Sequence, residues 1–405
     1  MVLRLCRQIL ERKFSMSTPE ISSRLPNASS SEKSSPICRR IVVKAGTSLL
    51  TQGTDQLSEE IMEMLVGQIS NLHQNGMEMI LVSSGAVSAG RHVLKVSRDE
   101  EGLPIRQVLA AVGQSRLMHA YEQLFRIHGI TVAQALLSRR DLSDRLGYLN
   151  VRNTLLALLE REVVPIINEN DVVAVDELAG EIFGDNDTLS AMVANLVDAD
   201  LLVMLGDVEG LFTSDPNLDP DARLISKVKK VDESIQTMGG PSWDDRGQGG
   251  MATKLEAAKL ATVSGIDVVI ASGLERDVLP RLAYGEDIGT LFPAASTKME
   301  SRNRWMLSGL SIRGEILVDN GAVDALCHKN KSLLPAGVMN VTGTFERGDI
   351  VSILDSKRSQ IGCGIANYGS AQLSKIKGLH SNRIFDVLGQ QYGDEIIHRN
   401  NLVIL

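Results

Sequence analysis

The chain has 405 residues, of which 43% are hydrophobic and 23% are charged, and its formal net charge is −8. This length exceeds what one typical hydrophobic core supports, so we expect two domains. No apolar run reaches the ~20 residues of a transmembrane helix, which excludes an integral membrane protein. The acidic balance argues against a general nucleic-acid binder, because binding to a phosphate backbone needs a basic surface. The four cysteines form no Cys-x-x-Cys pair, which favours a reducing compartment over a zinc knuckle or a disulfide framework.

Residues 1–38 are rich in serine, with six basic and three acidic side chains, and they are predicted to form a disordered tail. The stretch from Met1 to Phe14 spaces arginines among Leu and Ile, as an amphipathic transit peptide does. An ordinary solvated tail explains the same residues equally well. We therefore expect a cytoplasmic protein, with mitochondrial import as the alternative if residues 1–38 are a transit peptide.

Between residues 41 and 292 the pattern alternates strand and helix. The β-branched run Ile41-Val42-Val43 predicts a central parallel strand, and Ser58 is placed to cap a helix that ends at Gly76. Helices of this length between strands imply parallel pairing through βαβ crossovers, so we predict a three-layer α/β/α sandwich over residues 39–295. The other expected strands cover residues 79–82, 130–132, 163–167, 201–205 and 266–270, and two expected helices cover residues 105–127 and 149–161.

Beyond residue 295 the chain changes character. Residues 296–311 are polar and are predicted to be a linker. Short β-like runs at 314–318, 348–354 and 361–365, separated by glycines, predict a small β-rich domain over residues 312–405. This segment carries ten Lys or Arg and nine Asp or Glu, so it presents no basic surface and RNA binding is not expected.

Small polar clusters follow the predicted strands of the first domain. Lys44 and Gly46 follow the first strand, Ser84 follows the second, and Asn168 and Asp171 follow the strand at 163–167. Because the carboxyl ends of parallel strands meet at one edge of a sheet, these residues are expected to converge there. A solvated lysine and ordinary Asn/Asp turn chemistry remain the alternatives.

Three later segments extend this pattern. Asp187 reads as a helix N-cap, but two carboxylates around an asparagine in Gly184-Asp185-Asn186-Asp187 favour contact with a substrate or with magnesium. Asp207 follows the strand at 201–205 in a turn suited to a nucleotide. The paired glycines of Gln248–Lys254 place Lys254 in the first turn of a helix, where an anion is favoured and a flexible lid is the alternative.

Two lysines that flank carboxylates and amides suit in-line phosphoryl transfer, because catalysis then requires positioning and charge neutralisation by lysine and Mg²⁺. A carboxylate acceptor needs no general base, since it is already nucleophilic at neutral pH. Neither a P-loop signature nor Gly-x-Gly-x-x-Gly after the first strand is present. The chain is therefore not a P-loop enzyme, and a dinucleotide oxidoreductase is disfavoured.

From residue 41 to residue 405 the chain resembles the amino acid kinase family, in its glutamate-phosphorylating branch. The resemblance implies ATP-dependent phosphorylation of the L-glutamate side-chain carboxylate, the first step of proline biosynthesis, with Mg²⁺ as cofactor and proline as feedback inhibitor. The C-terminal segment is similar to a PUA domain, a small pseudo-barrel that binds RNA in other proteins, and here we expect a structural or regulatory module. A homo-oligomer is also expected. The matching motifs are Val-Val-Lys-Ala-Gly-Thr-Ser (42–48), Ser-Ser-Gly-Ala (83–86), Ala-Ala-Val-Gly-Gln-Ser-Arg-Leu (110–117), Asn-Glu-Asn-Asp (168–171), Gly-Asp-Asn-Asp (184–187) and Gly-Gly-Met-Ala-Thr-Lys (249–254).

By this resemblance Lys44 and Lys254 neutralise the transferring phosphoryl group, and Asp187 organises the two lysines and is a possible magnesium contact. The residues implied to hold glutamate are Ser84, Asp171 and Asn186, supported by Asn168 and Asp185. Those implied on the ATP side are Lys44, Gly46, Gly206, Asp207, Gln248, Gly249, Gly250, Met251, Ala252, Thr253 and Lys254.

Two positions depart from the family pattern, because Gly206 replaces the usual Ser or Thr and Gln248 often corresponds to Thr. Both departures concern the nucleotide contacts and leave the implied reaction unchanged. Two alternatives remain: another carboxylate or carbamate kinase of the same fold, and an RNA-associated protein whose kinase-like domain is a scaffold.

Overall fold

The computed structural model describes residues 37–97, 100, 102–138, 141–142, 145–173, 186–216, 218–240, 250–295, 312–329 and 331–404. Nearly all of the predicted tail, the whole predicted linker, and the site candidates Asp185, Gln248 and Gly249 lie outside these residues. Within the described part of the chain, no helix has the length and apolarity needed to cross a membrane.

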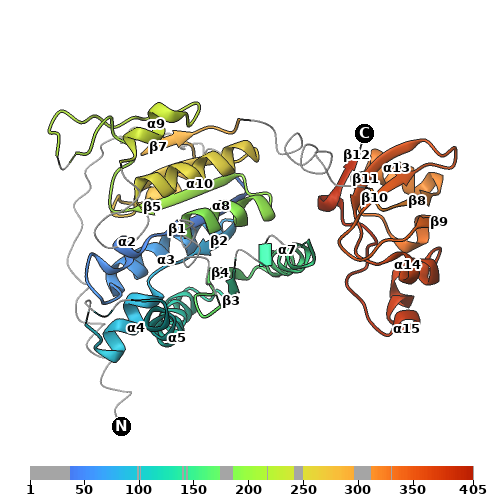
Figure 1. Cartoon of the computed structure of the whole chain (residues 1–405), viewed down its shortest axis with the longest axis horizontal. Helices are drawn as coiled ribbons and strands as arrows, with labels where there is room; N and C mark the ends of the chain where they lie inside the picture. Colours follow the sequence, from blue (N-terminus) through green and yellow to red (C-terminus); the bar gives the residue numbers. More distant parts are fainter. Residues whose placement is uncertain are drawn as a thin grey trace, which may run out of the picture. The chain divides into compact units, whose positions relative to one another are not determined.

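The first domain (Figure 1) is built on a seven-stranded sheet, whose strands follow the order β3-β4-β2-β1-β5-β6-β7. β1 pairs in parallel with β2 on one side and with β5 on the other, and the first six strands all run parallel. This confirms the predicted parallel sheet, to which the short strand β7 adds an antiparallel edge. The strands are β1 (Arg40–Ala45), β2 (Glu78–Val82), β3 (Val132–Leu137), β4 (Val164–Glu169), β5 (Leu201–Gly206), β6 (Asp267–Ser272) and β7 (Thr290–Phe292).

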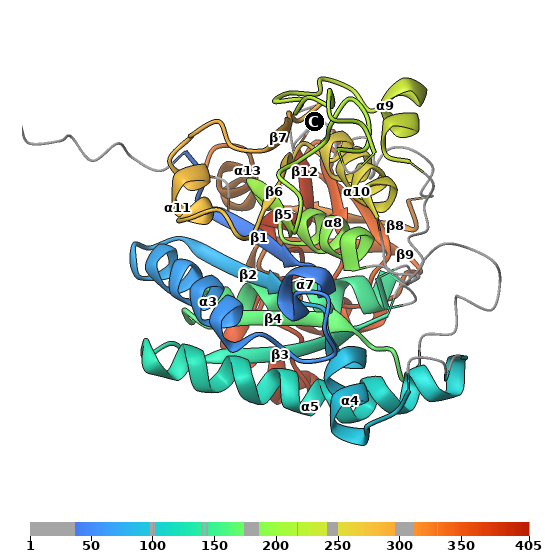
Figure 2. The same ribbon diagram turned by 90° about the vertical axis from the view of Figure 1, so that its left-hand side faces the viewer.

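Helices cover both faces of this sheet, which confirms the three-layer sandwich (Figure 2). One face packs against α2 (Thr47–Thr51), α3 (Glu59–Gln74), α5 (Leu103–Ile127) and α11 (Val278–Ala283). The other face packs against α7 (Arg145–Leu159), α8 (Asn186–Leu196) and α10 (Met251–Val263). The helix α3 forms as predicted, since the Ser58 hydroxyl accepts a hydrogen bond from the Ile61 N–H at its first turn. Two further helices are α4 (Ala86–Leu94) and α9 (Glu233–Met238).

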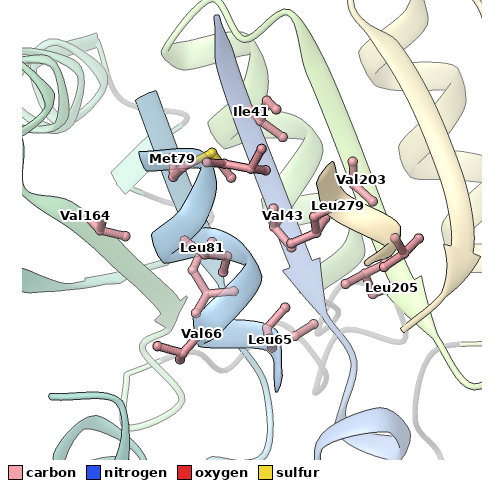
Figure 3. Packing of buried hydrophobic residues seen from close by; sticks show 14 of the residues in the cluster. Ile41, Val43, Leu65, Val66, Met79, Leu81, Val164, Val203, Leu205 and Leu279 are labelled. Atoms are coloured by element: carbon pink, nitrogen blue, oxygen red, sulfur yellow. The ribbon is translucent and has the colours of Figure 1, made fainter. Parts of the chain in front are cut away.

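Alternation along β1 decides where the first lysine points. Ile41 and Val43 pack into the core against α3 and α11 (Figure 3), whereas Val42 packs into the core on the opposite face. Because successive side chains of a strand point to opposite faces, Lys44 falls on the same face as Val42. The end of β1 therefore directs an ammonium group into the layer that contains α8 and α10, where a buried charge requires a partner.

The second domain is a five-stranded sheet in the order β12-β11-β10-β8-β9, which confirms the predicted small β-rich module. Its core gathers side chains from distant parts of the segment, among them Ile316, Phe345 and Tyr368. The strands are β8 (Gly314–Val318), β9 (Val338–Gly343), β10 (Ile350–Leu354), β11 (Gln360–Ile365) and β12 (Leu402–Ile404). The helices are α13 (Asn320–Cys327), α14 (Ser370–Ile376) and α15 (Ile384–Leu388).

Candidate active site

Two lysines that are 210 positions apart in the sequence meet on one carboxylate. Asp187 lies in the first turn of α8 and is completely buried. The Lys44 Nζ atom is 2.5 Å from Asp187 Oδ1, and the Lys254 Nζ atom is 3.1 Å from Asp187 Oδ2. The Thr253 hydroxyl is 2.9 Å from the same Oδ2 atom. The structure thus brings together the three residues that the sequence analysis named as catalytic.

The two ammonium groups keep this carboxylate ionised. Burial alone would raise the pKa of Asp187, but the charges of Lys254 and Lys44 and the hydrogen bonds from Lys44 and Thr253 outweigh it. The resulting pKa lies well below the usual value of an aspartate. At this point two buried ammonium groups contact the same carboxylate, and positive charge gathered in this way suits the approach of a further anion.

Glycines line the approach to the lysines. A Cβ atom on Gly46 would lie 3.6 Å from Lys44 Nζ, and one on Gly206 would lie 3.7 Å from Lys254 Cε. Gly250 is the N-cap of α10, so its first turn presents backbone N–H groups next to Lys254. Of the other residues predicted on the nucleotide side, Thr253 is buried against Asp187, Met251 and Ala252 are half-buried, and Asp207 is exposed just beyond β5.

A chain of side-chain amides lies beside the lysines. Asn186 Nδ2 donates to Ser84 Oγ and to Asn168 Oδ1, both at 3.0 Å. Asn168 Nδ2 in turn donates to Gln114 Oε1 at 2.7 Å. The structure therefore joins Ser84, Asn168 and Asn186, which the sequence analysis assigned to the substrate. Gln114 belongs to the motif 110–117, but no role was predicted for it, because it lies within a helix rather than at a strand end.

The substrate candidate Asp171 lies near the first turn of α5. Asp171 follows β4, its side chain is 15% exposed, and its carboxylate is 3.7 Å from Arg106 Nη2. The neighbouring Gln107 Nε2 donates to the Val172 carbonyl at 3.1 Å. The contact of Arg106 with Asp171 was not predicted, because a helical pattern does not show which of several arginines faces a loop.

Tyr121 of α5 supports the turn that presents Ser84. The Ser83 and Tyr121 hydroxyls are 2.8 Å apart and both side chains are buried. Burial raises the pKa of Tyr121, so its hydroxyl remains protonated and able to donate. Gly85 adopts φ +94°, a left-handed conformation that favours glycine. These contacts hold the Ser83-Ser84-Gly85 turn in place between β2 and α4.

The described residues do not form a protein-held metal site. Among them there is no group of three or more His, Cys, Asp or Glu side chains that is arranged to bind a metal ion. Both oxygens of Asp187 face lysine ammonium groups. This donor set fits a carboxylate that orients cations rather than one that binds Mg²⁺ directly.

Comparisons with known proteins agree with this arrangement. The model of the amino acid kinase family matches residues 39–272, and the model of the PUA domain matches residues 314–388. The glutamate 5-kinase of Dehalococcoides mccartyi is 55% identical over 367 residues, which are 91% of this chain and 98% of that protein. The glutamate 5-kinases of Herpetosiphon aurantiacus and Shewanella oneidensis are 50% and 48% identical, over 90% and 91% of this chain and 98% of each relative.

Proposed function

Because the chain belongs to the amino acid kinase family, we propose that it transfers the terminal phosphoryl group of ATP to the side-chain carboxylate of L-glutamate. The product is L-glutamyl 5-phosphate, and the reaction is the first step of proline biosynthesis. The observation that carries this proposal is the buried cluster of Lys44, Asp187 and Lys254 at the carboxyl edge of the sheet. The names of the relatives supply the acceptor.

The cluster suits the charge changes of the reaction. A glutamate carboxylate oxygen forms a bond to the γ-phosphorus while the bond from that phosphorus to the bridging oxygen of ADP breaks. Negative charge develops on the transferred group and on the leaving oxygen, and the ammonium groups of Lys44 and Lys254 neutralise it. Asp187 keeps both lysines in place and takes no proton, since its pKa is well below the usual value. No general base is needed.

The two substrates approach this cluster from different sides in our proposal. Glutamate is held by Ser84, Asn186 and Asp171, with Asn168 and Asp185 in support. ATP occupies the side of Gly46, Gly206, Asp207 and residues 248–254. Mg²⁺ bound to the nucleotide would supply further charge neutralisation at the phosphate oxygens, since Mg²⁺ in kinases is held largely by substrate phosphates and water.

We also propose that proline inhibits the enzyme by competing with glutamate. Proline shares the α-carboxylate and the α-nitrogen of glutamate, so it can use the polar groups that hold that end of the substrate. It lacks the side-chain carboxylate and cannot accept phosphate. We propose separately that the enzyme is a homo-oligomer. This proposal does not depend on the contacts described above.

An acceptor-specificity assay tests the function. Purified enzyme is incubated with ATP, Mg²⁺ and hydroxylamine, which traps an acyl phosphate as a hydroxamate, while ADP release is measured in parallel. We expect ADP and hydroxamate in equal amounts with L-glutamate and only background with L-aspartate, acetate or carbamate. Preference for a different acceptor would instead favour another carboxylate or carbamate kinase. ATP-independent retention of RNA on filters with no activity toward any acceptor would favour the RNA-associated alternative.

A further inference from the structure

The amide chain beside the lysines has a direction. Asn186 donates through Nδ2 to Asn168 Oδ1, and Asn168 donates through Nδ2 to Gln114 Oε1. Each amide thus uses its NH₂ group toward the next carbonyl oxygen. A chain of this kind must end in opposite ways, with an unused carbonyl at the first member and an unused NH₂ at the last.

Both ends of the chain are buried. Asn186 Oδ1 and Gln114 Nε2 are shielded from solvent, and among the described residues neither has a hydrogen-bond partner. A buried polar atom without a partner costs roughly 1–3 kcal/mol, so two of them in one network call for an explanation. One is an acceptor and the other is a donor, which is the pair of groups that an α-ammonium and an α-carboxylate require.

Close helix packing fixes the position of Gln114. A Cβ atom on Gly113 would lie 1.7 Å from the Ala86 carbonyl oxygen, and one on Gly90 would lie 1.9 Å from that of Leu109. Only residues without a side chain permit α4 and α5 to approach so closely. Gln114 is the next residue after Gly113, whose backbone lies against that of Ala86, the first residue of α4. This contact places Gln114 next to the turn that carries Ser84.

We propose that Gln114 Nε2 donates a hydrogen bond to the α-carboxylate of the amino acid substrate, and that Asn186 Oδ1 accepts one from its α-ammonium group. This inference rests on the proposed function and adds Gln114 as a residue that determines specificity for the amino acid end of the acceptor. Asn186 adjoins Asp187 in α8, whereas Gln114 lies two hydrogen bonds farther along the chain. The far end of the chain thus suits the end of glutamate that does not react.

The variant Gln114→Glu tests the proposal. A glutamate at this position keeps an oxygen for Asn168 Nδ2 but replaces the donor with an anionic oxygen. We expect KM for L-glutamate to rise roughly 10- to 100-fold, while kcat and KM for ATP change by less than about threefold. The α-amide of glutamate, which retains the reacting side-chain carboxylate, serves as an alternative acceptor in the same assay. The preference for glutamate over this α-amide, as a ratio of kcat/KM values, is expected to fall at least about tenfold.

A structural role would leave this ratio unchanged, because packing and support of Asn168 do not distinguish the two substrates. An unchanged ratio in an active Gln114→Glu enzyme would overturn the inference. Gln123→Glu is the matched control, since it introduces the same charge nine residues further along α5. Gln114→Met, which removes the donor without adding charge, should also lower the ratio and provides the measurement if the first variant does not fold. Wild-type enzyme that is inactive on glutamate would instead overturn the proposed function.

Discussion

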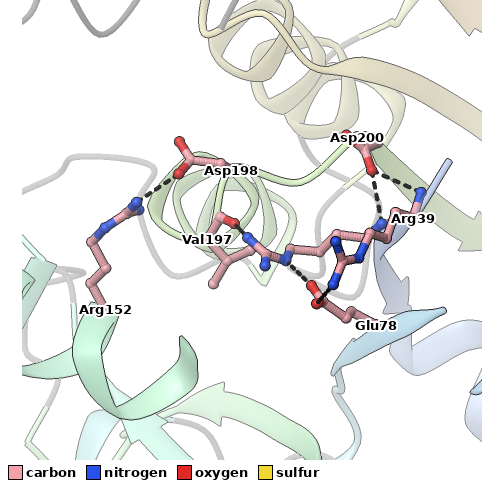
Figure 4. Close-up of polar contacts among 7 residues, drawn as sticks. Arg39, Glu78, Arg152, Val197, Asp198 and Asp200 are labelled. Atoms are coloured by element: carbon pink, nitrogen blue, oxygen red, sulfur yellow. Dashed lines mark hydrogen bonds and ion pairs between the residues drawn. The ribbon is translucent and has the colours of Figure 1, made fainter. Parts of the chain in front are cut away.

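The parallel sheet carries ion pairs both where its strands begin, the amino edge, and where they end, the carboxyl edge, and these pairs differ in how deeply they are buried. At the amino edge, Arg40 Nε is 2.6 Å from Glu78 Oε2 and Arg39 Nη2 is 3.1 Å from Glu78 Oε1 (Figure 4). Asp200 Oδ2 accepts the backbone N–H groups of Arg39 and Arg40, each at 2.8 Å. The Arg39 side chain is 80% exposed, whereas those of Arg40 and Glu78 are each 19% exposed, so this cluster is only partly buried.

At the carboxyl edge the charged groups are buried instead. Asp187 is fully buried, and two ammonium groups share it. The adjacent amide chain ends in Asn186 Oδ1 and Gln114 Nε2, which have no partner among the described residues. Ion pairs alone therefore do not mark a site, since both edges have them. Ion pairs that are buried from solvent, next to buried polar atoms without a partner among the described residues, indicate where a ligand completes the structure.

The largest expected effect comes from removing one of the two shared cations. Lys254→Ala should lower kcat roughly 10²- to 10³-fold, because the ammonium charge stabilises the transferring group chiefly in the transition state. KM for glutamate should change by less than about threefold. Coupled measurement of ADP release gives both constants. Lys259→Ala, an exposed lysine on the same helix, is the control that should leave them unchanged. Unaltered turnover in Lys254→Ala would contradict the proposal that the cluster at the carboxyl edge takes part in phosphoryl transfer.

The second prediction concerns the shared anion. Asp187→Asn leaves two buried ammonium groups without their carboxylate, so we expect the free energy of unfolding to fall by about 3–5 kcal/mol, together with a loss of turnover. Sulfate or ATP should raise the melting temperature of this variant more than that of the wild type, since an anion replaces the missing charge. Equal stabilisation of both proteins by these anions would contradict the arrangement.

The pH dependence of this difference follows from the pKa of Asp187. The folded-state pKa lies below the unfolded value of about 3.9, so the stabilisation is fully present above that value and is lost as the pH falls through the folded pKa. The difference in unfolding free energy between wild type and Asp187→Asn should therefore stay constant from about pH 6 to about pH 8. Chemical denaturation at several pH values measures it, and a slope in this range would assign the effect to another group.

The sequence predicted the elements whose physical cause is local. The run Ile41-Val42-Val43 is a buried strand, the Ser58 cap is present, and both lysines lie at the predicted carboxyl edge. Two element bounds differ from those predicted: the strand expected from Ile130 begins at Val132, and the helix expected from Leu149 begins at Arg145. The short strands β7, β9 and β12 were missed, because their pairing depends on distant partners.

The parts of the site that escaped prediction are set by tertiary contact. Gln114, Tyr121 and Arg106 all belong to α5, and a helical pattern alone does not show which polar residues face the edge of a sheet. Gly113 was the available signal, since a glycine inside a long helix indicates close packing of another backbone. Recognising that contact with Ala86 required the position of α4, which the sequence analysis did not predict.

The third prediction addresses the substrate side of the carboxyl edge. Asp171→Ala should weaken binding of both L-glutamate and L-proline roughly tenfold, since a carboxylate that pairs with a substrate ammonium contributes about 1–2 kcal/mol. Isothermal titration calorimetry of each ligand measures the change. Asp207→Ala serves as the control, because this exposed carboxylate lies on the proposed nucleotide side. Unchanged affinity for both amino acids would place their pocket elsewhere.

The smallest effect is expected at the amino edge, and it completes the comparison. Glu78→Gln removes the shared carboxylate of Arg39 and Arg40, as Asp187→Asn does for the two lysines. Arg39 is exposed, and the partly buried Arg40 still donates to the Val197 carbonyl, so the free energy of unfolding should fall by only about 1 kcal/mol, and kcat should not change. The loss should also shrink in about 1 M salt, where exposed charges are screened within about 3 Å. Urea denaturation at low and high salt, with activity assays on the same samples, measures all three. A loss as large as that of Asp187→Asn, or a fall in kcat, would mean that the depth of burial does not distinguish the ion pairs of the two edges.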